Sequence, residues 1–478
     1  MTRSLRLIHL LCLTGILCLV STGLAAQSLR AGAATSNITP ELGVSIVGGF
    51  APMVATHVHD ELHARCLVLD DGNTKLALVV CDILGLRGGV SKEARRLIKE
   101  ATGIPAENVL ISATHTHSAG SALGDSRYEY NAPLNAYQQF LARRIADGVR
   151  RADNLLRPAQ IAFSSVEAPE HVFNRRWFMR EGTAPENPFG KIDKVKMNPP
   201  RASANLVEPA GPTDPALSFI ALREPEGRLI SIFATYSLHY VGGVPASEIS
   251  ADYFAVFSEH LKSLQPDSSG AKDAPFVAMM ANGTSGDINN INFREPAQKM
   301  TAYEKMNRVG KDLANKVNAA IPALAWKEQA ALSASYREIT LQRKPLTPEL
   351  VTWAEKTLSS APRIKGRVSL PFIYAERVQS LSKLDDKVSV PLQYLRIGEI
   401  DIGTSPCETF AETGLEFKKR SQAPHAFMVS LVHDYLGYLP TPRHFELGGY
   451  ETWPGTNHLE PQASVKILDA LLEMEQSL

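Results

Sequence analysis

The sequence predicts an α/β fold in which mixed β-sheets are flanked by helices. Short apolar runs of strand length alternate along the chain with longer stretches in which apolar residues recur at helical spacing. Three of these runs, residues 230–235, 276–280 and 427–432, are followed at once by polar, glycine-rich or histidine-bearing residues. Ligands of α/β proteins gather at strand ends, so these endings predict one shared site.

The first predicted elements are a β-hairpin and a helix. Two apolar runs, 67–69 and 76–80, flank a turn of sequence Asp-Asp-Gly-Asn, which is a strong hairpin signal. Apolar residues at helical spacing over 90–101 predict a helix that stops at Gly103, and the apolar run 109–113 predicts the next strand.

Helical spacing continues through the rest of the chain, without an obvious internal repeat and without a convincing linker. We expect the proline-rich stretch 180–215 to be a long loop or lid and residues 342–391 to be a mixed insertion. The remaining predicted helices cover residues 137–150, 252–264, 302–319 and 464–478.

The composition is that of a loop-rich globular enzyme. The chain has 478 residues, 44% of them hydrophobic, and its 50 basic and 50 acidic residues give a formal net charge of zero. Balanced charge provides no electrostatic attraction to nucleic acid or to an anionic membrane. We therefore expect a small-molecule or lipid substrate, no nucleic acid and no stable membrane anchor.

Residues 1–26 predict a secretory signal peptide. Arg3 and Arg6 precede an apolar run that ends at Val20, and small residues follow at a plausible cleavage site. We expect export to the periplasm or the exterior, with one mature domain over residues 27–478. Three of the five cysteines remain in that domain, too few for a disulfide framework.

The segment Thr-His-Thr-His-Ser at residues 114–118 directly follows the predicted strand 109–113. Side chains two apart lie on one face of a strand, so His115 and His117 are expected to point into one pocket. Two convergent imidazoles beside hydroxyls indicate a metal that activates water or a hydroxyl. The alternative is an exposed polar strand end. A metal site requires further ligands elsewhere in the sequence.

Later strand ends supply such ligands. His239 follows the run 230–235 and is the best third ligand, although a core histidine bonded to a backbone carbonyl would fit equally well. Residues 281–290 form a loop of small and polar residues, whose N–H groups suit an oxyanion hole or which could carry a nucleophile. An ordinary Asn/Gly turn is the alternative there. Glu408 follows another strand and a proline.

The order of these motifs resembles the catalytic domain of the neutral (non-lysosomal) ceramidase family. His-x-His, a single histidine, a Gly/Ser/Asp loop, Pro-x-Glu, Tyr-x-Gly-Tyr and Gly-Tyr-Glu follow one another between about Gly32 and Glu451. The resemblance implies the family's catalytic fold with its site at strand ends. It also implies a zinc-dependent amidohydrolase of the N-acylsphingosine type, acting in sphingolipid metabolism.

The resemblance also implies roles for individual residues. His117 matches a histidine that contacts the substrate or the zinc-bound water, Arg175 an arginine at the substrate amide carbonyl, and Tyr450 a tyrosine of the same pocket. Asn282 is a candidate for holding the oxyanion or the substrate. Zinc bound by two imidazoles and a carboxylate keeps a position open for water. The implied zinc ligands are His115, His239, Glu408 and Tyr438.

Two features depart from the family pattern. The family carries a serine in the 281–290 loop, and alignment on the Gly-Asp pair that ends at Asp287 places Gly283 there. Thr284 or Ser285 would replace that serine only after rearrangement of the loop, so attack by zinc-bound water is expected. The chain also ends before the family's immunoglobulin-like domain, which predicts a short variant.

We therefore expect an exported zinc hydrolase that cleaves an amide, by family default that of ceramide or another N-acyl lipid. A soluble N-acyl sugar, an N-acyl amino acid or an ester is the alternative substrate. A metal-containing binding protein without turnover is the alternative function.

Overall fold

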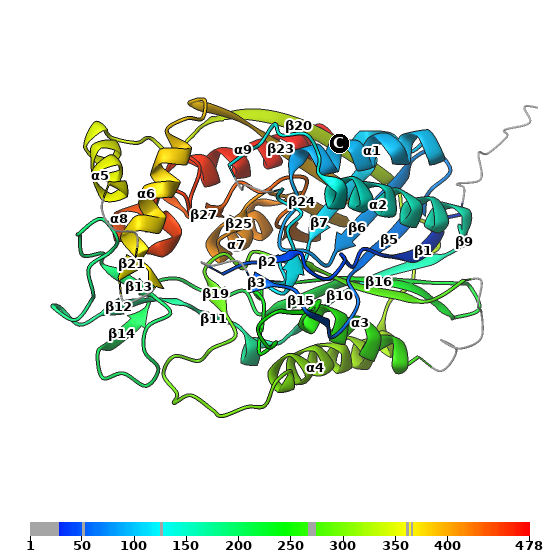
Figure 1. Ribbon diagram of the computed structural model, residues 1–478. Helices are drawn as coiled ribbons and strands as arrows, with labels where there is room; N and C mark the ends of the chain where they lie inside the picture. The colour runs from blue at the N-terminus through cyan, green and yellow to red at the C-terminus, as the bar shows by residue number, and fades with distance from the viewer. Residues whose placement is uncertain (1–27, 50–52, 125–127, 266–273, 360–362, 365–366) are drawn as a thin grey trace, which may run out of the picture.

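Three β-sheets form the framework of the protein, and helices cover their outer faces (Figure 1). The computed structural model describes residues 28–49, 53–124, 128–265, 274–359, 363–364 and 367–478. The predicted signal peptide lies outside the described residues. None of the helices in these ranges is both long enough and apolar enough to cross a membrane.

The first sheet has the strand order β7-β6-β5-β1-β9, and α1 and α2 lie side by side on it (Figure 1). Its hairpin and helix are those predicted from the sequence, and α1 ends at Gly103, which has a φ of 75°. Its elements are β1 (Arg30–Asn37), β5 (His63–Asp70), β6 (Lys75–Cys81), α1 (Gly88–Thr102), β7 (Val109–Ala113), α2 (Ala136–Asn154) and β9 (Arg157–Pro158).

The second sheet has the order β10-β15-β16-β18 and is covered by α3 and α4 along the lower edge of Figure 1. Its elements are β10 (Gln160–Glu167), β15 (Ala216–Arg223), β16 (Leu229–Tyr236), α3 (Tyr253–Ser263), β18 (Val277–Asn282) and α4 (Glu304–Ala320).

The third sheet has the order β20-β23-β24-β26 and is covered by α7 and α9. Its elements are β20 (Leu332–Gln342), β23 (Lys387–Ile397), β24 (Ile400–Thr404), α7 (Ala411–Arg420), β26 (His425–Val429) and α9 (Ala463–Gln476). The strand predicted over 427–432 ends at Val429, because Leu431 and His433 adopt positive φ values of 59° and 68° and turn the chain away.

The three sheets repeat one arrangement that has no counterpart in the residue pattern. In each, antiparallel strands lead to a final strand that is parallel to its neighbour: β6 with β7, β16 with β18, and β24 with β26. One helix joins each parallel pair: α1, α3 and α7 respectively. Parallel strands end at the same sheet edge, so every sheet presents two chain segments there.

The inner faces of the three sheets share one apolar core. In β5, Leu67 and Leu69 lie in this common core, while Ala64, Cys66 and Val68 contact the helices on the other face. This alternation is the two-residue period of a strand that is buried on both faces. The central core fixes the sheets relative to one another, and with them the strand ends. Within the described ranges the three cysteines are buried and carry free thiols.

Shorter elements connect the sheets. The stretch 180–215, predicted as a loop, carries two short strands that pair with β12, and the insertion 342–391 contains the packed helices α5 and α6. The short strands are β2 (Ser45–Val47), β3 (Met53–Val54), β4 (His57–Val58), β8 (Ala119–Gly120), β11 (Phe173–Asn174), β12 (Arg176–Met179), β13 (Val195–Met197), β14 (Leu206–Pro209), β17 (Glu248–Ile249), β19 (Ile288–Asn289), β21 (Arg363–Ile364), β22 (Arg367–Val368), β25 (Glu408–Thr409) and β27 (Tyr438–Leu439). The remaining helices are α5 (Pro348–Leu358), α6 (Leu370–Leu381), α8 (Pro442–Leu447) and the 3-10 turns η1 (Ala106–Asn108), η2 (Pro169–His171), η3 (Ile321–Ala323) and η4 (Tyr450–Thr452).

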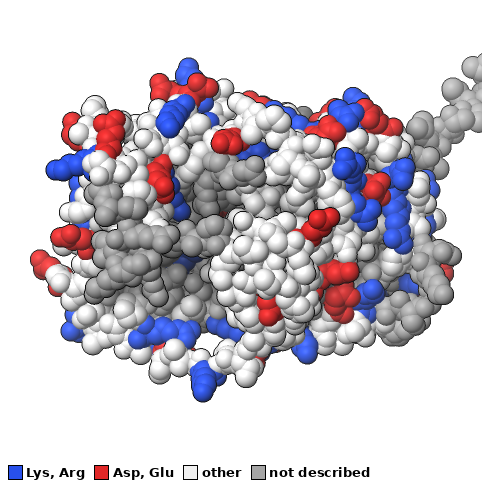
Figure 2. Space-filling view, viewed as in Figure 1, with Lys and Arg blue, Asp and Glu red and all other residues white. Residues whose placement is uncertain are grey.

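Basic and acidic side chains are interspersed over the face shown in Figure 2, in keeping with the net charge of zero.

Candidate metal centre

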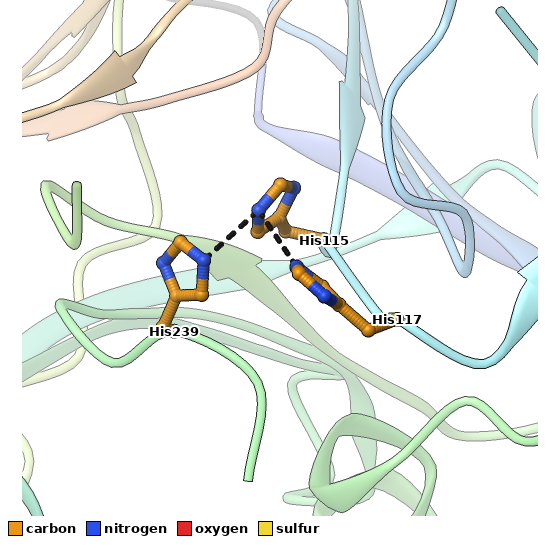
Figure 3. A group of neighbouring side chains, drawn as sticks. All are labelled: His115, His117 and His239. Atoms are coloured by element: carbon orange, nitrogen blue, oxygen red, sulfur yellow. Dashed lines mark hydrogen bonds between the residues drawn. The ribbon is translucent and has the colours of Figure 1, made fainter. Parts of the chain in front are cut away.

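Three histidines and one glutamate converge between the sheets. His115, His117 and His239 point toward one another (Figure 3), with Nε2 of His115 3.1 Å from Nε2 of His239 and 3.2 Å from Nε2 of His117. Oε2 of Glu408 lies 3.2 Å from Nε2 of His115 and 3.6 Å from Nε2 of His239. The structure thus brings together three of the four ligands implied by the sequence, and His117 beside them.

A tight turn, not a strand face, directs the first two histidines. Strand β7 ends at Ala113, and His115 has a φ of 73°, which reverses the chain. A left-handed conformation outside glycine costs on the order of 1 kcal/mol and persists where neighbouring contacts fix it. Here the N–H of His115 donates to the carbonyl of Ile83 at 2.9 Å, and the Thr116 hydroxyl donates to the carbonyl of Ser250 at 2.7 Å.

Backbone carbonyls set the tautomer of both buried histidines. Nδ1 of His115 lies 2.7 Å from the carbonyl oxygen of Leu84, and Nδ1 of His239 lies 3.1 Å from that of Ser285. A carbonyl only accepts, so Nδ1 carries the proton and the lone pair of Nε2 faces the cluster, as in metal-binding histidines. Burial also lowers the pKa of His239 well below its ordinary value, which keeps this ring neutral.

Glu408 presents one carboxylate oxygen to the cluster. Oε1 accepts a hydrogen bond from the Tyr435 hydroxyl at 2.7 Å, whereas Oε2 is buried without a hydrogen-bond partner among the described residues. Burial would raise the pKa of Glu408, but the hydroxyls of Tyr438 and Tyr435 oppose this, and the pKa lies below its ordinary value. A buried, ionised oxygen with no donor is costly unless a cation faces it.

This donor set fits a zinc ion. Two neutral imidazoles and one carboxylate are a common protein ligand set of catalytic zinc. His115, His239 and Glu408 are 2 to 4% exposed, whereas His117 is half-buried and its ring stacks on Tyr240 with the centroids 3.8 Å apart. His117 therefore lies on the more open side of the cluster.

Arg175 lies at the other side of the site and is held by a buried carboxylate. Its Nε donates to Oε1 of Glu451 at 2.9 Å, while Arg176 pairs with Oε2 of the same group. Nη2 of Arg175 is buried and bonds to no group in the described part of the chain. Its guanidinium carbon lies 5.2 Å from the ring centroid of Tyr438. One cationic N–H is thus left for a ligand beside the metal cluster.

Two tyrosines complete this wall. Tyr438 is the parallel register partner of Glu408, because β25 pairs with β27. Its ring lies nearly parallel to that of His239, with centroids 6.5 Å apart, and its centroid is 5.7 Å from that of Tyr450. Tyr438 therefore lies between Glu408 and Arg175, and Tyr450 lies beside Tyr438.

The loop after β18 supports the site from behind. Nδ2 of Asn282 donates to the carbonyl of Thr114 at 3.0 Å, and its Oδ1 accepts from the Ser285 hydroxyl at 2.7 Å. Oγ of Ser285 lies 3.5 Å from Nδ1 of His239, on the side of that ring that faces away from the cluster. Asn282 and Ser285 thus fix the histidine segments, and neither has its polar group directed at the Nε2 atoms.

Gly283, Thr284 and Asp287 also have structural contacts. A Cβ at Gly283 would lie 2.7 Å from Oγ of Ser237, and Oγ1 of Thr284 packs directly against Gly414 of α7. Asp287 is fully buried: its carboxylate accepts from Ala411 N at 2.9 Å and from Asn174 Nδ2 at 2.8 Å. The polar side chains of Asn282, Ser285 and Asp287 thus bond within the protein, and the backbone N–H groups of the loop stay the predicted oxyanion donors.

Three residues of the site were not predicted from the sequence: Tyr435, Tyr240 and Glu451. Tyr435 is the first tyrosine of Tyr-x-Gly-Tyr and Glu451 ends Gly-Tyr-Glu, so both motifs contained the signal without indicating which group each side chain would reach. Tyr240 directly follows His239, where stacking on His117 depends on the tertiary fold.

More than half of the chain matches a known protein family. The family model for "Neutral/alkaline non-lysosomal ceramidase, N-terminal" matches residues 30–307. The neutral ceramidase of Pseudomonas aeruginosa is 22% identical over an alignment of 483 positions, and the match covers 88% of this chain and 68% of that protein.

Two solved structures share the fold. One, described as a ceramidase complexed with C2, has a TM-score of 0.70 at 17% identity. The match covers 94% of this chain and 75% of the ceramidase chain. The other, neutral ceramidase from Pseudomonas aeruginosa, has a TM-score of 0.68 at 17% identity, with coverages of 95% and 75%.

Proposed function

Because this chain belongs to the neutral/alkaline non-lysosomal ceramidase family, a family of hydrolases, we propose that it is an exported zinc-dependent amidohydrolase of ceramide-like N-acyl lipids. The observation that carries the proposal is the convergence of His115, His239 and Glu408, with a buried carboxylate oxygen that lacks a donor among the described residues. The ceramidase relative and the two similar ceramidase structures support the substrate class. The predicted signal peptide supports export.

His115 and His239, through Nε2, and Glu408, through Oε2, would hold the zinc ion, with the Tyr438 hydroxyl beside them. When bound, Zn²⁺ acts as a Lewis acid and lowers the pKa of a coordinated water to about 7, so that hydroxide is available at neutral pH.

Arg175 would bind and orient the scissile amide. Its buried Nη2 lacks an acceptor in the described residues, and the carbonyl oxygen of the substrate would supply one. As the carbonyl carbon becomes tetrahedral, negative charge grows on that oxygen and the charged N–H bond strengthens. Glu451 fixes the guanidinium before substrate arrives, so no reorganisation is needed during the reaction.

His117 would carry the proton. Its Nε2 faces the cluster while its ring is half-buried, so it lies between the water position and the open side of the site. From there Nε2 would accept a proton from the attacking water and donate it to the leaving amine nitrogen. Stacking on Tyr240 holds the plane of the ring in this orientation, and Tyr450 would line the substrate pocket.

The test is metal removal and reloading. Full-length protein is stripped with a chelator, reloaded with zinc, and assayed for fatty acid release from an N-acylsphingosine and from a soluble N-acyl amino acid. We expect activity on the lipid amide to disappear and return with one equivalent of zinc. Glu408→Gln should stay inactive after reloading, whereas Glu416→Gln, a matched change on the partly exposed face of α7, should respond like the wild type.

Full activity of the metal-free protein would contradict the zinc dependence. Stoichiometric zinc without hydrolysis of either amide would contradict the enzyme assignment and favour a binding protein. Hydrolysis of the soluble amide alone would contradict the lipid substrate while leaving the metal chemistry in place.

A further inference from the structure

A cavity lies apart from the candidate metal centre, where α1 begins. Its volume is about 530 Å³, and it is lined by residues of α1, of β20 and of the segment that follows β26. None of the residues assigned above to metal or substrate binding lines it. The side chains that matter for its chemistry are two arginines, Arg95 and Arg343, each stacked on a tyrosine.

Among the described residues, neither guanidinium forms an ion pair with a carboxylate. Arg95 is 6% exposed; it lies 4.7 Å from the ring centroid of Tyr336, and its Nε is buried without a partner in the described part of the chain. Arg343 lies 4.7 Å from the centroid of Tyr130, and its Nε and Nη1 likewise lack partners there. The exposed carboxylate of Asp385 also lines the cavity but forms no ion pair with either group.

The other two carboxylates of the cavity are already bonded. Glu338 accepts hydrogen bonds from the hydroxyls of Tyr336, at 3.0 Å, and Ser389, at 2.5 Å. Asp434 accepts from the backbone N–H groups of Gly88, at 3.0 Å, and Tyr435, at 2.8 Å. Each of these carboxylates also has a cationic partner, since Lys92 lies 4.0 Å from Glu338 and Arg87 lies 3.6 Å from Asp434. Lys387 lines the cavity as well and offsets the charge of Asp385. The charge left over is therefore positive and comes from the two guanidiniums, whose planar donors match oxyanions.

We propose that this cavity binds a small molecule of the phosphate monoester class. A guanidinium binds phosphate through two parallel N–H···O bonds, and two unbalanced guanidiniums match the charge of a phosphate monoester, about −2 at neutral pH. The cavity is several times larger than a phosphate group, so the organic part of the ester also has room. A soluble phosphate ester and the headgroup of an anionic phospholipid share this chemistry.

Isothermal titration calorimetry of the full chain with glycerol 3-phosphate tests the site, with glycerol and sodium chloride at matched ionic strength as blanks. Sedimentation with phosphatidic acid vesicles, against phosphatidylcholine vesicles, tests the lipid source. Each lost charged hydrogen bond should weaken binding about tenfold or more, so Arg95→Met and Arg343→Met should raise the dissociation constant by that factor. Arg96→Met is the matched control, because Arg96 is on the same helix, is about half exposed and pairs with Glu93 and Glu100.

Binding of either probe that is lost in Arg95→Met and kept in Arg96→Met supports the site, and the probe that binds identifies the source. Arg95→Lys should restore part of the affinity, which separates loss of charge from misfolding. No heat and no vesicle binding by the wild type, or equal binding by Arg95→Met and Arg96→Met, would overturn the proposal.

Discussion

The two halves of the candidate site are held in different ways. His115, His239 and Glu408 each follow a strand of a different sheet, and each is fixed by a backbone carbonyl or a tyrosine hydroxyl. Arg175 lies between two short strands outside the three main sheets, and it depends on one buried carboxylate, Glu451. The metal half is thus set by the framework, whereas the substrate half rests on a single ion-pair cluster.

The repeated sheet arrangement explains this division. The chain after β7 carries the first two histidines, the chain after β16 carries His239, and the chain after β24 carries Glu408. Each position follows a strand of a parallel pair. The shared core holds the three sheets in fixed positions relative to one another. The candidate ligands therefore come from the parallel pair of each sheet, His239 and Glu408 after its first strand and His115 after its second.

Removing one residue from each half should separate binding of metal from use of substrate. We expect His115→Ala to lose both zinc and activity. Its zinc affinity should fall by much more than the ~10–100-fold that is typical when a residue hydrogen-bonded to a metal ligand is removed. Arg175→Met should keep one zinc per chain and lose activity by about 100- to 1000-fold, as for a lost oxyanion donor. Metal analysis beside a kinetic assay checks this, and loss of zinc in Arg175→Met would show that the halves are not independent.

Glu451→Gln should affect stability more than metal binding. The change leaves two buried guanidiniums short of a countercharge, and breaking a buried pair costs about 3–5 kcal/mol in free energy of unfolding. Chemical denaturation of the zinc-loaded protein measures the difference, with metal content as the second readout. A change within about 0.5 kcal/mol, the range of ordinary surface substitutions, would contradict the role assigned to this carboxylate.

The stability difference between wild type and Glu451→Gln should also depend on pH. Burial would raise the pKa of Glu451, but Arg176 and Arg175 outweigh it and hold the pKa below its ordinary value. The stabilisation is therefore complete above the ordinary carboxyl pKa of about 4.3 and is lost as the pH falls through the lower, native value. The stability gap between wild type and Glu451→Gln should narrow below about pH 4.3, and a gap that widens there would contradict this assignment.

The sequence predicted which polar side chains converge better than it predicted how they are held. Glu408 and the three histidines were found because polar residues end apolar strands, a pattern that survives folding. The positive φ of His115 and the bond from Tyr435 to Glu408 were not predictable, because both depend on segments that meet only in the tertiary structure. The repeated sheets were missed for a related reason: they share topology and strand order, which leave no residue repeat.

A side chain at Gly283 tests whether the supporting loop has room for a nucleophile. Gly283→Ser would place Cβ 2.7 Å from Oγ and 3.0 Å from N of Ser237, and the second contact is with backbone that cannot rotate away. We expect a loss of about 1–3 kcal/mol in stability, as for overpacked cores, and no gain in activity. Gly89→Ser separates this clash from the loss of a glycine, because Gly89 also lacks a positive φ and its Cβ would meet only the end of the Leu134 side chain, at 3.2 Å. Raised turnover in Gly283→Ser would show that the loop can deliver a hydroxyl to the site.

Tyr435→Phe should produce the smallest effect, because it removes one hydroxyl and leaves the ring in place. Without the 2.7 Å bond to Oε1, Glu408 loses one of the donors that keep it ionised and aimed at the histidines. Loss of a residue that hydrogen-bonds to a metal ligand weakens metal affinity by about tenfold at the low end of the usual range. The zinc dissociation constant should therefore rise about tenfold. Tyr137→Phe is the matched control, since its hydroxyl bonds to the carbonyl of Ile38, away from the cluster. Competition with a zinc chelator measures both variants, and equal zinc affinity in the two would mean that the framework alone positions Glu408.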